Sequence, residues 1–271
     1  KGVKNRTVEL YANINRSLLP NDRGPVDRSP DAFRRMALKA VQAGFAALKC
    51  APFDECRAPF DSAGLPREVE AGLARFAAVK EVCGPEKEVY VDCHSRFDLE
   101  SSLVLEVKLR EAAAAWFEEP VDPLRCSKAL KQICKEASLP VVGGELGYGL
   151  PLFQRLMDQN IVDIVMPDVM FCGGPVEAHR IGNRLESAKG GCVSLHCPSG
   201  PISLLASAHA TTAFGNSLPL EHAYNEVDWR HEVLEPCEKI QDGCLHLPDG
   251  FGLGARVNPS VIERRGRQWE P

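Results

Sequence analysis

The feature that most constrains the fold is a regular alternation of short apolar segments with longer amphipathic segments. Six consecutive apolar segments end in an acid or a histidine, at intervals of 23 to 28 residues. These end residues are Asp92, Glu118, Glu145, Asp168, His196 and Glu221. Alternating strand and helix patterns with short connections predict a parallel sheet. Any one of these residues alone would most simply cap a helix or lie in a solvated loop, but six in succession indicate a shared functional edge.

The strand and helix positions follow from apolar runs and capping signals. We expect strands over residues 7–14, 45–49, 88–91, 115–117, 140–144, 162–166, 191–195 and 218–220. The first helix is predicted to begin after a Ser29 cap, with Pro30 in its first turn, and to end at Gly44. Eight strand–helix units within roughly 250 residues are typical of a (β/α) barrel, in which functional residues lie at the carboxyl ends of the strands.

The domain organisation follows from the same pattern. The predicted barrel occupies residues 1–222, and residues 223–271 form a C-terminal segment that does not continue it. Within that segment, residues 244–247 and 250–254 predict a small hairpin that packs away from the barrel.

Composition and charge exclude several classes of partner. The chain has 271 residues, of which 44% are hydrophobic and 25% charged, as in a soluble globular protein with an ample core. Its formal net charge of -5 provides no general attraction to nucleic acid or to an anionic membrane. No apolar run approaches the length of a membrane span. Eleven cysteines without a C-x-x-C pair predict reduced thiols and a cytoplasmic location.

Three of the strand-end acids predict a metal site. Asp92, Glu118 and Glu145 follow three successive predicted strands, so we expect their side chains to meet at one edge of the barrel. Three hard oxygen ligands, with no thiolate or imidazole among them, suit Mg²⁺. A zinc hydrolase barrel would carry a pair of imidazoles on its first strand, where this chain has Asn13 and Asn15.

Two histidines are predicted beside this metal site. His196 and Asp168 end adjacent predicted strands. An aspartate next to an imidazole fixes its tautomer and raises its basicity, which is the usual arrangement of a general base. Asp92, His94 and Arg96 alternate at the end of another strand, so they are expected to share one face.

These motifs together resemble the barrel of the enolase superfamily, in its mandelate racemase subgroup, from residue 7 to about residue 258. The motifs that match are Asp92, the run Phe117-Glu118-Glu119-Pro120, Gly144-Glu145, Pro167-Asp168 with Gly173-Gly174, and His196. Within the subgroup, Asp92-x-His94-x-Arg96 and the run from His196 to Ile202 are most similar to sugar-acid dehydratases of the galactonate and mannonate kind. The resemblance implies a TIM-like barrel with an N-terminal α+β capping domain.

The resemblance also implies a reaction, that of a carbon–oxygen lyase. Mg²⁺ would bind the carboxylate of an aldonic or aldaric acid, and His196, backed by Asp168, would remove the proton on the α-carbon. His94 would protonate the departing β-hydroxyl, so that a 2-keto-3-deoxy acid forms. Arg96 and His222 would contact the substrate. The expected partner is therefore a small sugar acid, and we expect the protein to be a homo-oligomer.

Some positions depart from the subgroup's pattern. Its racemases carry Lys-x-Lys on the second strand, where this chain reads Lys49-Cys50-Ala51, which disfavours two-base racemisation through that pair. Lys49 would either neutralise the substrate carboxylate or serve as a structural cation. Glu221 would either contact the substrate as a further acid or be a charge at the rim. Leu146 stands where galactonate-type enzymes have an arginine, so galactonate is not assigned as the substrate.

Two other functions stay open at this stage. One is a racemase or epimerase of a 2-hydroxy acid that uses His94 and His196 on opposite faces of the substrate. The other is a non-catalytic barrel that binds a sugar acid. Because the chain starts at the first predicted strand, we expect the capping domain to be absent from it and residues 223–271 to return toward that domain.

Overall fold

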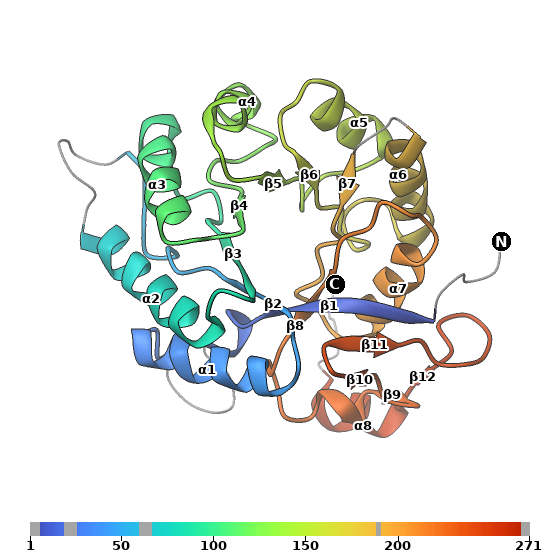
Figure 1. The fold of residues 1–271 in the computed structure, drawn as a ribbon. Coiled ribbons are helices and arrows are strands. Elements are labelled where there is room, and N and C mark those ends of the chain that lie inside the picture. The colour runs from blue at the N-terminus through green and yellow to red at the C-terminus, as the bar shows by residue number, and fades with distance from the viewer. Residues whose placement is uncertain (1–5, 19–25, 60–66, 188–190, 267–271) are drawn as a thin grey trace.

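A ring of eight parallel strands forms the centre of the computed structural model, which describes residues 6–18, 26–59, 67–187 and 191–266 (Figure 1). The strands are β1 (Thr7–Asn13), β2 (Ala47–Cys50), β3 (Glu88–Asp92), β4 (Trp116–Glu118), β5 (Val141–Gly143), β6 (Ile164–Val165), β7 (Cys192–Val193) and β8 (Leu220–Ala223). Each strand pairs with the next from β1 to β7, and β8 pairs with β1. A bridge between Val193 and Ser217 links β7 to the segment before β8 and closes the ring.

Seven α-helices lie outside this ring, one between each pair of consecutive strands among the described residues (Figure 1). They are α1 (Pro30–Gln42), α2 (Arg67–Cys83), α3 (Leu99–Glu111), α4 (Ser127–Glu136), α5 (Leu150–Asp158), α6 (Pro175–Ser187) and α7 (Pro201–Thr211), and a short 3-10 helix, η1 (Arg16–Leu18), precedes α1. Ser29 caps α1 by accepting a hydrogen bond from the Ala32 amide, as its position before Pro30 predicts. The predicted (β/α) barrel is confirmed, although a 3-10 helix and short strands follow β8 before the last helix, α8 (Pro259–Arg265).

Two layers of side chains fill the barrel, one on each side of the strands. The larger apolar core lies between strands and helices. A smaller cluster fills the interior of the ring and consists of Tyr11, Ala47, Tyr90, Trp116, Val142 and Met166. Since alternate residues of a strand share a face, the residues two positions further along β1 to β4 also point inward. Polar side chains at the carboxyl ends of the strands therefore lie above an apolar floor.

The floor is built from aromatic rings in contact. Tyr90 stacks on Trp116 with ring centroids 3.7 Å apart, and Tyr11 meets both rings edge-on at 5.2 and 5.4 Å. All three side chains are buried. Among the described residues, this packing closes the barrel below the polar layer.

The end of the barrel and the C-terminal segment differ from the sequence expectations. β8 runs through Glu221 to Ala223, because it pairs with four residues of β1, whereas the sequence suggested that the strand ended before Glu221. The predicted hairpin exists, but it is formed by β10 (Lys239–Gln241) and β11 (Cys244–His246). It does not pack away from the barrel: β11 pairs antiparallel with the first half of β1, which the barrel strands leave free.

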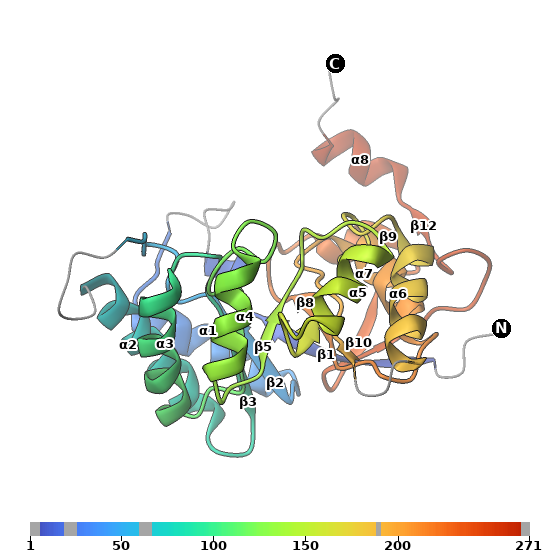
Figure 2. The same ribbon diagram turned by 90° about the horizontal axis from the view of Figure 1, so that it is seen from above.

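The remaining C-terminal elements lie beside the barrel. They are η2 (Arg230–Glu232), β9 (Leu234–Glu235), β12 (Arg256–Val257) and α8 (Pro259–Arg265), with β9 and β12 paired antiparallel. Figure 2 shows α8 extending beyond the body of the barrel. The eleven cysteines are all free thiols. In the described part of the chain, the helices are too short or too polar to span a bilayer.

A first prediction concerns α6, which connects the strands that carry Asp168 and His196. A Cβ added at Gly182 would lie 2.2 Å from Cδ1 of the buried Phe214 ring. Replacing glycine by alanine in a helix raises the free energy of unfolding by up to about 1 kcal/mol. Overpacking a core lowers it by about 1–3 kcal/mol. We expect Gly182→Ala to lower the free energy of unfolding by about 1 kcal/mol in urea titrations. Adding Phe214→Leu should restore part of the loss, and a more stable single variant would contradict this packing argument.

Candidate active site

Three carboxylates meet above the interior floor, at the carboxyl ends of the strands. Asp92 and Glu118 are the last residues of β3 and β4 and lie directly opposite each other in the strand register. Glu145 follows β5 by two residues. One oxygen from each of the three side chains lies within 4.8 Å of the others, and Asp92 and Glu118 are buried. The three acids predicted to share an edge are therefore brought together, in an arrangement that could hold a divalent cation.

Lys49 lies against these carboxylates at the end of β2. Its Nζ is 2.7 Å from Glu118 Oε1, 2.9 Å from Glu221 Oε1 and 3.8 Å from Asp92 Oδ2, and its side chain is 1% exposed. Of the two roles suggested by the sequence, these contacts support the structural cation, since Nζ is surrounded by protein carboxylates and not by open space.

Glu221 is buried inside the same network. Asn13 Nδ2 donates to its Oε1 at 2.7 Å, and the Cys197 amide donates to its Oε2 at 2.9 Å. With Lys49 also on Oε1, both oxygens have partners and the side chain is 0% exposed. The sequence left open a rim charge or an acid that contacts the substrate. A rim charge is wrong, because β8 extends past Glu221 and holds it in the interior at 0% exposure. Contact with the substrate stays a prediction, since Oε2 lies 3.8 Å from His196 Nε2.

The charges of this cluster do not balance, and this favours a cation. Burial raises the pKa of Glu118, Lys49 lowers it, and the neighbouring Asp92 and Glu221 charges raise it again, so that it lies well above the ordinary value. For Glu221, burial is outweighed by Lys49 and His196, which lower its pKa. The ammonium of Lys49 is thus shared by the carboxylates of Asp92, Glu118 and Glu221. Glu118 Oε2 is moreover buried without a hydrogen-bond partner. An oxygen donor set with one unpartnered buried oxygen fits Mg²⁺.

His196 and Asp168 form the predicted pair. Nδ1 of His196 is 2.8 Å from Asp168 Oδ2, and a parallel bridge joins the two residues. The other oxygen of Asp168 accepts the Met170 amide at 2.7 Å, which fixes the carboxylate. His196 Nε2 faces Glu145 Oε2 at 3.0 Å. Burial would lower the pKa of His196, but Glu221 and the hydrogen bonds to Asp168 and Glu145 outweigh it and raise this pKa well above the ordinary value.

His94 lies on the other side of the carboxylates, but not as an extension of the strand. β3 ends at Asp92, and His94 and Ser95 form a turn with φ values of 45° and 57°. The Asp92 side chain holds this turn by accepting the His94 amide at 2.9 Å. The ring then returns toward the site, with Nε2 2.9 Å from Asp92 Oδ2. The charge of Asp92 and hydrogen bonds to Asp54 and Asp92 raise the pKa of His94 to about 11, against the effect of burial.

The turn also changes the expectation for Arg96. Alternation along an extended strand predicted one face for Asp92, His94 and Arg96, and this is wrong because the chain leaves the strand conformation after Asp92. Arg96 is half-buried, and its Nε has no hydrogen-bond partner.

His222 lies away from the carboxylates. It is paired with Ala12 in the β1–β8 register, and Ala12 belongs to the core between strands and helices. Its ring stacks on Phe45 with centroids 6.0 Å apart. Burial lowers the pKa of His222 to about 3. The predicted substrate contact of His222 is not supported, because neighbouring residues of a strand face opposite sides and Glu221 takes the inward side.

Two residues of the site were not identified from the sequence. Asp54, in the loop after β2, lies with Oδ1 2.5 Å from His94 Nδ1. Glu119 accepts the amides of Gly144 and Glu145 at 2.8 and 3.2 Å, and thereby holds the segment that carries Glu145. Glu119 is next to Glu118 in the sequence and was part of a matched motif, whereas no spacing or motif marks Asp54.

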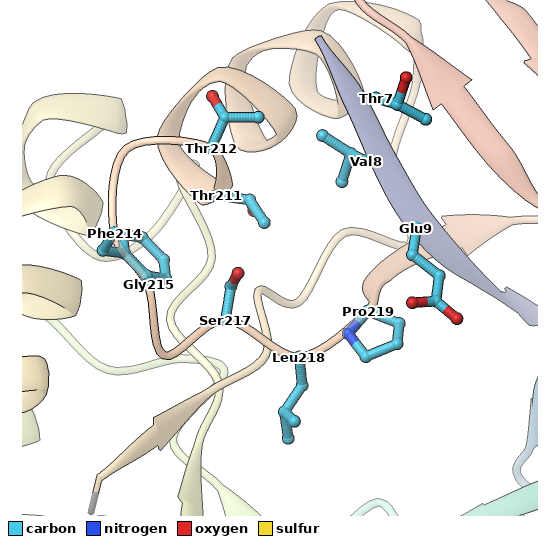
Figure 3. A pocket seen from close by; sticks show the side chains of 10 residues that line it. All are labelled: Thr7, Val8, Glu9, Thr211, Thr212, Phe214, Gly215, Ser217, Leu218 and Pro219. Atoms are coloured by element: carbon cyan, nitrogen blue, oxygen red, sulfur yellow. The ribbon is translucent and has the colours of Figure 1, made fainter. Parts of the chain in front are cut away.

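A cavity of about 320 Å³ lies at the opposite end of the barrel (Figure 3). Its lining comes from the start of β1, the end of α7 and the segment before β8: Thr7, Val8, Glu9, Thr211, Thr212, Phe214, Gly215, Ser217, Leu218 and Pro219. These are the amino ends of the strands, whereas the carboxylates occupy the carboxyl ends. The cavity is therefore separate from the candidate active site.

Comparisons with known proteins agree with this geometry. The model of the family "Enolase C-terminal domain-like" matches residues 32–261. The chain is 31% identical over 199 residues to an arabinonate dehydratase of Saccharolobus solfataricus, covering 73% of this chain and 52% of the relative. It is 30% identical over 196 residues to a D-xylonate dehydratase of Haloferax volcanii, covering 72% of this chain and 47% of the relative. The chain thus spans about half the length of these curated relatives.

Solved structures show the same fold. A mandelate racemase/muconate lactonizing enzyme-like protein from Rubrobacter xylanophilus superposes with a TM-score of 0.86 at 31% identity, over 97% of this chain and 69% of that one. A putative dehydratase from Salmonella enterica superposes with a TM-score of 0.85 at 23% identity, over 97% of this chain and 68% of that one.

Proposed function

Since this chain belongs to the enolase C-terminal domain-like family, we propose that it is the barrel of a Mg²⁺-dependent sugar-acid dehydratase, a carbon–oxygen lyase. One observation carries the proposal: two histidines from separate segments, after β3 and after β7, approach the carboxylate cluster, each with Nε2 within 3.0 Å of one of the proposed ligands. Relatives named as arabinonate and D-xylonate dehydratases support an aldonic acid as the substrate class.

Asp92, Glu118 and Glu145 are the proposed metal ligands. When bound there, Mg²⁺ would act as a Lewis acid on the substrate carboxylate and lower the pKa of the proton on the α-carbon. Lys49 and Glu119 hold the ligand carboxylates in place from behind, through Glu118 and through the backbone of Glu145. Neither of them needs to contact the substrate in this proposal.

His196 is the proposed base and His94 the proposed acid. Asp168 accepts from Nδ1 of His196, so that Nε2 is the nitrogen that would take the α-proton, in place of its contact with Glu145 Oε2. The electron pair of the broken C–H bond forms the double bond to the β-carbon, and the β-hydroxyl leaves with a proton from His94 Nε2 as water. The resulting enol tautomerises to the 2-keto-3-deoxy acid. Arg96, with its unpartnered Nε, is proposed to bind a substrate oxygen.

The same proposal includes the domain organisation and the assembly. We assign residues 1–222, with Ala223 added because it ends β8, to the catalytic barrel. The residues that follow, up to residue 271, are assigned to a segment that returns toward a capping domain. In this segment β9 pairs with β12, and α8 extends beyond the barrel (Figure 2). A homo-oligomer is expected, and sedimentation of the full-length protein would test it.

The metal prediction tests the function directly. We expect the full-length protein with Mg²⁺ to convert at least one of arabinonate, D-xylonate, D-gluconate and D-galactonate to a 2-keto-3-deoxy acid. Removing metal with EDTA should lower the rate about 100-fold, because the charge developing on the carboxylate then lacks its counter-ion. Readdition of Mg²⁺ should restore the rate.

Variants separate a specific metal requirement from a general salt effect. Glu118→Gln should no longer respond to Mg²⁺. Glu136→Gln, an exposed position at the end of the outer helix α4, should respond as the unmodified protein does. Inversion of a carbon centre without loss of water would instead favour the epimerase. Binding without turnover would favour the non-catalytic barrel, and activity that persists in EDTA would contradict the metal assignment.

A further inference from the structure

The two histidines of the candidate site have matching surroundings. Each places Nδ1 on an aspartate from a different segment, His196 on Asp168 at 2.8 Å and His94 on Asp54 at 2.5 Å. Each places Nε2 on a carboxylate of the proposed metal cluster. The pair made by His94 is not visible in the sequence, because Asp54 lies 40 residues before it in a loop.

We propose that Asp54 is a positioning residue for His94, and that the two form a second aspartate–histidine pair dedicated to departure of the β-hydroxyl. This inference rests on the proposed dehydratase function. Asp54 accepts from Nδ1 and thereby directs Nε2 toward the substrate side of the carboxylate cluster. The Asp168–His196 pair would serve the α-proton and the Asp54–His94 pair the leaving group.

Asp54 is itself held in place by a fixed arginine. Arg28 Nη1 lies 3.3 Å from Asp54 Oδ2 and donates to Asn15 Oδ1 at 3.0 Å. Arg28 Nη2 donates to the Ala51 carbonyl at 2.8 Å, and the arginine side chain is 10% exposed. One oxygen of Asp54 is thus anchored to the body of the barrel, and the other is directed at His94.

The neighbouring acid shows that anchoring the loop does not require Asp54. Glu55 accepts from Arg28 Nε at 2.8 Å and from Arg75 Nη1 at 2.6 Å, so both of its oxygens are directed at arginines and not at His94. The loop is therefore tied through Glu55 to α2 and to the segment just before α1. Asp54 shares the contact with Arg28, but of the two acids it is the one that contacts the His94 ring.

The backbone at His94 supports the same role. His94 and Ser95 both have positive φ, a conformation that costs side-chain-bearing residues energy and is retained mainly where the surrounding structure holds it. Here the Asp92 carboxylate holds the His94 amide, and the Glu119 carbonyl holds the Ser95 amide at 2.7 Å. The turn brings the ring back between Asp54 and Asp92, instead of letting it continue along the strand.

The test compares Asp54→Asn with Glu55→Gln in the full-length protein, with Mg²⁺ and an aldonic acid that the unmodified protein dehydrates. Loss of an outer hydrogen-bond partner typically costs about 10- to 100-fold. We expect that loss in dehydration for Asp54→Asn, with exchange of the α-proton for solvent deuterium retained. We expect Glu55→Gln to keep both rates. His94→Gln removes the acid itself, so the loss of dehydration rate in Asp54→Asn should not exceed the loss in His94→Gln.

Several results would overturn the inference. One is equal loss of exchange and dehydration in Asp54→Asn, since a general disturbance of the site would do this. Another is an unchanged dehydration rate in Asp54→Asn. A third is a loss of dehydration rate in Glu55→Gln as large as that in Asp54→Asn. If the unmodified protein dehydrates none of the acids, the proposed function fails, and crystal structures of the two variants still decide the positioning role. The His94 ring should turn away from Asp92 in Asp54→Asn only; an unmoved ring would refute that role.

Discussion

Replacing Lys49 by methionine is expected to lower the free energy of unfolding by about 3–5 kcal/mol, the range found when one partner of a buried ion pair is removed. The methionine fills most of the volume of the lysine stem but leaves Glu118 and Glu221 without their cation. Both carboxylates are 0% exposed, so water cannot take over the role of the ammonium. Urea titration in the presence of EDTA measures the loss.

The control is a lysine that is exposed. Lys128→Met, in the first turn of α4, should change the free energy of unfolding by less than about 0.5 kcal/mol. Adding Glu221→Gln to Lys49→Met should recover part of the loss, because the two residues are in contact and their effects are not additive. A loss below about 1 kcal/mol in Lys49→Met would mean that the carboxylates are not charged in the folded state.

Mg²⁺ should rescue the same variant if the carboxylates form its site. A ligand that binds only the folded state stabilises it by about 2.7 kcal/mol at a concentration of 100 times Kd. Without Lys49 the cluster carries one more uncompensated negative charge, so Mg²⁺ should stabilise Lys49→Met more than the unmodified protein. If Mg²⁺ stabilised Lys49→Met and the unmodified protein equally, the ion would bind at a site other than these carboxylates.

The features that could be predicted from the sequence are those that repeat locally. An apolar run and the polar residue that ends it are neighbours in the chain, so Asp92, Glu118, Glu145, Asp168 and His196 could be placed on one edge from spacing alone. The (β/α) alternation fixed the barrel for the same reason. Each of these inferences used only the direction of a strand and the side on which parallel strands end.

The expectations that failed depended on contacts between distant segments. β8 continues past Glu221 because four residues of β1 pair with it, and this pairing turns His222 toward Phe45. β11 joins β1 because the first half of that strand has a free edge. Alternation along an extended strand also could not describe His94. The amides of His94 and Ser95 donate to the Asp92 carboxylate and the Glu119 carbonyl, and these bonds hold a turn there. Asp54 reaches His94 only through the folded loop.

Substituting the two histidines should separate the two halves of the proposed reaction. His196→Gln removes the base, so both dehydration and α-proton exchange should fall by about 10²- to 10⁴-fold, the usual contribution of a general base. His94→Gln removes only the proton donor for the leaving hydroxyl. Dehydration should fall over the same range, while substrate recovered from deuterium oxide should carry deuterium at the α-carbon.

Proton NMR of the recovered substrate and a colour reaction for the 2-keto product measure the two rates side by side. His179→Gln, on the outer helix α6, is the control and should leave both unchanged. An epimerase would behave differently. Each histidine would then exchange the α-proton of one stereoisomer, and no water would be eliminated from the substrate. The asymmetry between His196 and His94 is therefore what distinguishes an elimination from a two-base inversion. Loss of exchange in His94→Gln for one isomer only would overturn the assignment of an acid and support two bases.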